Sequence, residues 1–97
     1  MLRPVLPADI SCTARALLMV PEGERGRLCL LIMDGSLLAA AHVRRTGRIH
    51  RNWGNGSLMA AARRFPLADE PDFSDPEYCR CTIQVLEAIA RLTRGRS

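Results

Sequence analysis

The sequence contains no lysine, and all fourteen of its basic residues are arginine. Two explanations fit this absence: codon usage in a GC-rich genome, or selection of arginine for planar, bidentate contacts to carboxylate and phosphate groups. Because the absence extends over the whole chain, it favours codon usage. The net charge of +4 is a mild basic bias that does not by itself identify a partner.

Aromatic residues are scarce, and long apolar runs are absent. Only four of the 97 residues are aromatic, so the core has to be built from aliphatic residues and alanine, a composition that favours helices. No stretch reaches the roughly 18 apolar residues of a membrane span. Asp9 and the prolines Pro4 and Pro7 interrupt any secretory pattern. We therefore expect a cytoplasmic protein without membrane association.

The common zinc-binding patterns are missing as well. The four cysteines, Cys12, Cys29, Cys79 and Cys81, form no pair of Cys-x-x-Cys spacings. Each cysteine stands among helix-forming residues, where a free thiol behaves as a small buried hydrophobe. We expect reduced thiols, no metal ion and no cofactor.

A chain of this length has room for one hydrophobic core, so residues 1–97 are expected to form a single domain. Apolar residues recur at helical spacing, and no segment alternates convincingly with the period of a strand. The sequence therefore predicts an all-α bundle of about four helices, over approximately 7–19, 21–45, 57–64 and 75–93.

Residues typical of helix ends support these boundaries. Pro7 suits the first turn of a helix, and Gly47 suits a left-handed C-terminal cap. Ser57 and Asp75 are good N-terminal caps, and Gly95 is expected to end the last helix. We expect this last helix to be the most buried of the four.

The residues of the second helix are compatible with two courses of the chain. The sequence Asp34-Gly35-Ser36 allows a break, but apolar spacing continues through it, so we favour one long helix bent at Gly35. A helix that is apolar nearly all round is either central or covered by a second molecule, and we expect a homodimer. The expected inward face contains Leu28, Leu31, Ile32, Leu38, Ala39 and His42, and it leaves out Leu30, Met33 and Leu37.

The most distinctive region of the chain is its basic segment, residues 42–64, which has six arginines, two histidines and no acid. Residues 66–78 follow with five acids and no arginine. Three alternatives are open: internal pairing or plain solvation, an acidic protein partner, or nucleic acid. The candidate binding surface consists of Arg44, Arg45, Arg48, His50, Arg51, Trp53, Asn55, Arg63 and Arg64.

A tight turn lies inside this segment, over Trp53-Gly54-Asn55-Gly56, with residues that tolerate positive φ. Its tryptophan is either exposed for stacking and interface contacts, or packs the loop onto the helices; packing is the favoured alternative.

Catalytic signatures are not apparent. His42 falls on the apolar face of its helix, and the arginines beside His50 would repel a metal ion. No Ser-His-Asp or Cys-His arrangement has a recognisable local pattern. We expect no catalytic residue and no enzyme activity.

The run from Trp53 to Ala62, with Thr46-Gly47-Arg48 and His50 before it, resembles the central motif of a small uncharacterised bacterial family, a domain of unknown function. The opening Arg3-Pro4-Val5-Leu6-Pro7 and the helix start at Asp75-Pro76 resemble it too. The resemblance implies a short bacterial helical protein, and it assigns no residue a catalytic role. Gly23, Gly26 and Gly35 depart from the family pattern.

These observations together predict a non-enzymatic protein-interaction module that self-associates, with the loop of residues 48–57 as its polar contact surface. Its partner would be a second copy or an acidic protein. The alternative is a nucleic-acid-binding accessory protein that uses the Arg-rich segment 44–64.

Overall fold

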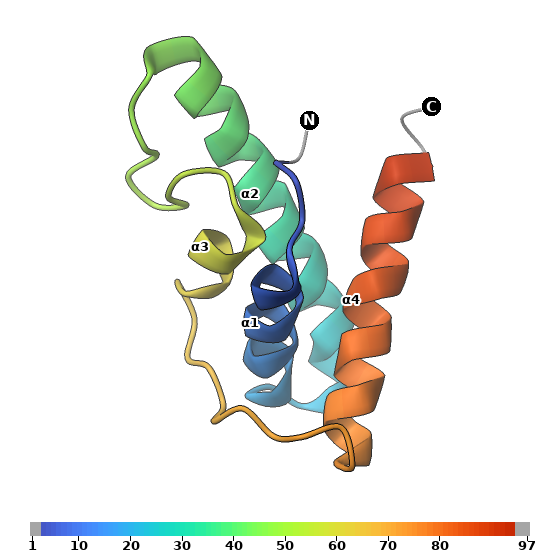
Figure 1. Cartoon of the computed structure of the whole chain (residues 1–97). Coiled ribbons are helices and arrows are strands. Elements are labelled where there is room, and N and C mark those ends of the chain that lie inside the picture. Colours follow the sequence, from blue (N-terminus) through green and yellow to red (C-terminus); the bar gives the residue numbers. More distant parts are fainter. Residues whose placement is uncertain (1–2, 95–97) are drawn as a thin grey trace.

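The computed structural model describes residues 3–94, and its α-helices are arranged around α1 (Figure 1). Within these residues the chain has four α-helices and no strand, which confirms the all-α prediction. The helices are α1 (Pro7–Leu18), α2 (Arg25–Thr46), α3 (Leu58–Ala62) and α4 (Pro76–Arg94), and a 3₁₀ turn η1 (Glu22–Glu24) precedes α2.

The expected helix caps are present. Ser57 Oγ accepts a hydrogen bond from the Ala60 N–H at 3.1 Å, and Asp75 Oδ1 accepts one from the Glu77 N–H at 2.9 Å. Gly47 ends α2 with a φ of 74°, in the left-handed region that favours glycine. The expected stop at Gly95 lies outside the described residues.

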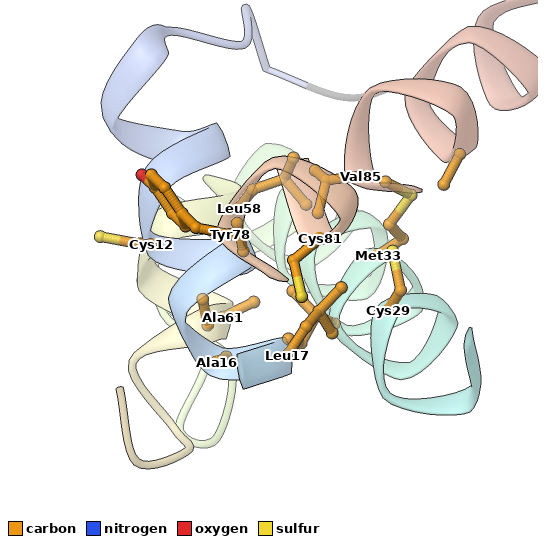
Figure 2. Close-up of a cluster of buried hydrophobic side chains, with 14 residues drawn as sticks. Cys12, Ala16, Leu17, Cys29, Met33, Leu58, Ala61, Tyr78, Cys81 and Val85 are labelled. Carbon is orange, nitrogen blue, oxygen red and sulfur yellow. The ribbon is translucent and has the colours of Figure 1, made fainter. Parts of the chain in front are cut away.

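The helix α1 is the centre of the bundle, and it contacts α2, α3 and α4. Half of its residues are buried, whereas α4 lies at the edge and buries only Tyr78, Cys81, Val85 and Ala88. The prediction that the last helix is the most buried is therefore wrong. Figure 2 shows the resulting core, in which Leu17 of α1 lies among side chains from the other three helices.

A buried carboxylate joins the first turns of two helices. Asp9 is 6% exposed. Its Oδ2 accepts a hydrogen bond from the Leu6 N–H at 2.8 Å, and its Oδ1 accepts one from the Met59 N–H at 2.9 Å. Both donors are otherwise unpaired amides at the start of a helix, so Asp9 holds α1 and α3 in one arrangement.

The helix α2 runs without a break through Gly35, as favoured from the sequence, but it begins at Arg25, because residues 22–24 form the 3₁₀ turn η1. The expected inward face is correct for Ile32 and Ala39, which are buried, but not for two of its leucines. Leu31 and Leu38 point outward, at 45% and 55% exposure, whereas Met33 is buried. The inward side instead carries several small residues, among them Cys29, Ser36, Ala39 and Ala40, which allow neighbouring segments to approach closely.

The segment Glu22–Thr46 is long and apolar enough to cross a membrane, judged by length and composition alone. By these two criteria, the expectation that no segment is long and apolar enough to span a membrane does not hold. The core helix of a domain meets the same criteria, and the inward side of α2 packs into the core.

Candidate interaction surface

The loop between α2 and α3 is closed by its own backbone. The His50 N–H donates to the Gly54 carbonyl at 2.7 Å, and the Gly54 N–H donates to the His50 carbonyl at 3.0 Å. Inside this small ring, His50 Nδ1 accepts hydrogen bonds from the N–H groups of Asn52 and Trp53, at 3.1 and 3.2 Å. The imidazole therefore organises the turn as an acceptor, which is a structural role.

Two glycines let this loop approach the helices closely, Gly54 at Ala60 of α3 and Gly56 at Ala40 of α2 (Figure 1). Gly54 and Gly56 have φ values of 83° and 99°, which L side chains rarely adopt. A Cβ atom on Gly56 would also lie 2.9 Å from the Cα of Ala40 in α2. The predicted positive-φ turn is confirmed, and Gly56 is required both for its conformation and for this close approach.

The tryptophan of the loop packs onto the helix at a third glycine. A Cβ atom on Gly35 would lie 2.7 Å from Cζ3 of Trp53 and closer still to two other atoms of the indole. The ring is half-buried, and its centroid lies 6.2 Å from that of Phe65. Trp53 therefore attaches the loop to α2, as the favoured alternative expected, and Gly35 provides the space for it.

The two histidines contact each other nearer the C-terminal end of α2. The ring centroids of His42 and His50 are 5.1 Å apart in an edge-to-face arrangement. Because His42 belongs to α2 and His50 to the loop, this contact fixes the loop at a further point.

We expect His50→Ala to loosen this turn, since two backbone N–H groups lose their acceptor, at a cost of about 1–2 kcal/mol in the free energy of unfolding. His50→Asn is the matched control, because an Asn side-chain oxygen can accept from the N–H two residues later. Amide hydrogen exchange at Asn52 and Trp53 measures the effect directly. Faster exchange in the Ala variant than in the Asn variant is expected, and equal rates would contradict this role for Nδ1.

The arginines of the candidate surface occupy three places. Arg44 and Arg45 are in the last turn of α2, Arg48 and Arg51 are in the loop, and Arg63 and Arg64 follow α3; all six are exposed. The remaining candidate residue in the loop, Asn55, accepts a hydrogen bond from Arg3 Nη1 at its carbonyl, at 3.2 Å, and one from the Ser57 N–H at Oδ1, at 2.9 Å.

The acidic segment is directed away from most of these arginines. Its Glu77 carboxylate pairs with Arg25 at 2.7 Å and with Arg80, and the hydrogen bonds from these two arginines lower the pKa of Glu77. Asp72 and Asp75 accept hydrogen bonds from nearby backbone amides. In residues 3–94, no salt bridge is formed by Arg45, Arg48, Arg51, Arg63 or Arg64. For these five residues internal pairing does not occur, and plain solvation, an acidic protein partner and nucleic acid stay open as alternatives.

The cysteines are free thiols, and three of the four are buried. Burial raises the pKa of the Cys29 thiol to about 11 and also raises that of Cys81, so both remain protonated near neutral pH and are poor nucleophiles. Across the described part of the chain, no group of three or more His, Cys, Asp or Glu side chains is arranged to hold a metal ion.

The fold and this surface define a small all-α domain with a basic loop packed along its longest helix. A family model described as Domain of unknown function (DUF7742) matches residues 3–89, and the chain therefore belongs to that family. No curated protein and no solved structure matches the chain.

Proposed function

We propose that the protein is a non-enzymatic interaction module that associates with a second copy of itself. The observation that supports this most strongly is the outward side of α2, where Leu30, Leu31 and Leu38 are 59%, 45% and 55% exposed. Contiguous exposed apolar side chains on a small domain mark sites of association. A helix that is apolar on two sides needs a second layer to cover it.

The charge distribution supports association between like chains. The basic residues Arg45, Arg48 and Arg51 and the acidic residues Asp69 and Glu70 are all exposed on the same molecule. Oppositely charged surfaces that are not neutralised within one chain attract each other between two chains, which increases both the rate and the specificity of association.

The size of the molecule is sufficient for such an interface. Its accessible surface is 6122 Å², and a stable interface of standard size takes about 800 Å² from each partner. A dimer can therefore form through one face and leave most of the surface free for a further partner.

We expect light scattering after size-exclusion chromatography to show a mass that rises from that of the 10.7 kDa monomer towards twice that value with increasing protein concentration. Added salt should weaken the dimer, because part of the attraction is between exposed charges. A mass that stays monomeric at the highest accessible concentration would refute the proposal. Retention of such a monomer on heparin, with a steep salt dependence, would instead support the nucleic-acid alternative.

A further inference from the structure

An open apolar pocket lies between the end of α1, the start of α2 and the exit from α3. Its volume is about 320 Å³. The larger apolar side chains of its lining are Met19, Val20, Leu28, Leu31, Phe65 and Pro66. Met19 and Leu31 are 51% and 45% exposed, so the pocket is open to solvent.

The pocket has few polar groups that could orient a polar ligand. Small-molecule sites combine apolar walls with several convergent polar groups, whereas the charged side chains in this lining are Glu24 and Arg27 alone. The occupant that suits it is a single bulky apolar side chain supplied by a protein segment.

Three exposed arginines belong to the pocket lining or directly precede it in the sequence, against one acid, Glu24, in the lining. Arg27 contributes to the lining, and Arg63 and Arg64 directly precede Phe65 in the sequence. All three are exposed, and none forms a salt bridge within residues 3–94. A segment that carries the apolar side chain is therefore expected to be acidic.

The chain itself has such a segment. Phe73 is 65% exposed, with its ring stacked on Tyr78 at a centroid distance of 5.0 Å. The turn that presents it is closed by a hydrogen bond from the Asp75 N–H to the Asp72 carbonyl, at 3.2 Å. The ring has one face on Tyr78 and is otherwise exposed, and a side chain that is already ordered in this way loses little freedom on binding. The acids around Phe73 are Asp69, Glu70, Asp72 and Asp75.

We propose that Phe73 of one copy inserts into this pocket of a second copy, with its acidic neighbours facing the second copy's Arg27, Arg63 and Arg64. The inference rests on the proposed self-association and specifies its interface. In a two-fold dimer each copy supplies one Phe73 and one pocket, so the contact is made twice and the assembly closes.

The test uses two variants that each disable one half of the contact. Phe73→Ser removes the inserted ring, and Leu31→Glu places a carboxylate in the pocket wall, where it repels the acidic segment. Both positions are at least 45% exposed in the monomer, so both variants should fold, which circular dichroism verifies. Because each variant homodimer loses the contact twice, its dissociation constant should rise about a thousandfold, from about thirtyfold for each of two interface hot spots.

Mixing the two variants provides the decisive measurement. The Phe73→Ser chain keeps an intact pocket and the Leu31→Glu chain keeps an intact Phe73, so one of the two contacts is restored in a mixed dimer. Native mass spectrometry separates the two masses, and the mixed dimer should exceed each homodimer by far more than the twofold excess that random pairing of equal amounts gives. The control variants are Leu86→Glu and Ile83→Ser, at two residues of α4 that are 49% and 54% exposed and lie outside the pocket.

Each other outcome has a definite meaning. A wild-type protein that never dimerises refutes the proposed function and this inference together. A dimer that is unchanged in Phe73→Ser refutes the inference and leaves the proposed function standing. A mixture of the variants that remains monomeric, or a Leu86→Glu variant as defective as Leu31→Glu, also overturns the insertion of Phe73 into this pocket.

Discussion

Gly35→Ala is expected to displace Trp53 from α2 and to destabilise the protein, although alanine is the better helix former. The new methyl group would overlap the indole, which the loop and Phe65 hold in place. Overpacking of this kind costs about 1–3 kcal/mol, more than the roughly 1 kcal/mol that alanine gains over glycine in a helix. Because the chain has a single tryptophan, its fluorescence emission should shift to the red as the ring becomes exposed.

Gly26→Ala is the matched control, since it makes the same substitution in the same helix. There a Cβ atom would meet only Gln84 Nε2 at 3.6 Å, an ordinary contact. This variant should keep its fluorescence and be stabilised by less than about 0.5 kcal/mol, because Gly26 is the second residue of α2 and not in its middle. If urea unfolding gave the two variants the same stability, the packing of Trp53 against Gly35 would not be what requires glycine at this position.

Asp9→Ala is the second substitution for which we expect a large effect. It removes the acceptor for the N–H groups of Leu6 and Met59, and an amide left unsatisfied in a buried place costs about 1–3 kcal/mol. We expect a loss of about 2–4 kcal/mol in the free energy of unfolding, measured by urea denaturation.

Two further variants separate this role from charge alone. Asp9→Asn keeps one oxygen but brings an NH₂ group towards a donor, so it should be of intermediate stability. Asp69→Ala removes an exposed carboxylate and should change the stability by less than about 0.5 kcal/mol. An Asp9→Ala variant as stable as Asp69→Ala would show that the two helix starts do not depend on this side chain.

Local signals in the sequence predicted the helices well, because their ends are set by residues that act within one turn. Ser57, Asp75 and Gly47 each fulfil the predicted capping role. The orientation of α2 was not predictable in the same way, because it depends on which small residues face a distant segment. Leu31 and Leu38 suit a core by composition, yet the close approach of the loop at Ala40 favours small residues on the inward side.

The sequence identified the residues of the candidate surface but not the contacts that they make with other elements. The positive-φ turn follows from its glycines, whereas the partners of Trp53 and His50, which are Gly35 and His42, lie on another element. The role of Asp9 was not predictable for the same reason. The sequence indicates its position near the start of a helix, but the hydrogen bond that it accepts from the Met59 N–H joins residues 50 positions apart. The pocket beside Phe65 joins three segments of the chain and has no linear pattern.

The central position of α1 has a consequence for the synthesis of the protein. Helix α1 is translated well before α4, against which it packs, and Tyr78 of α4 lies 67 residues after its hydrogen-bond partner Ser11. Until α4 has been translated, Leu17 and its neighbours lack part of their covering. Such nascent chains expose apolar surface and are prone to aggregation, so ribosome-bound fragments that end before Pro76 should bind chaperones more strongly than the completed chain.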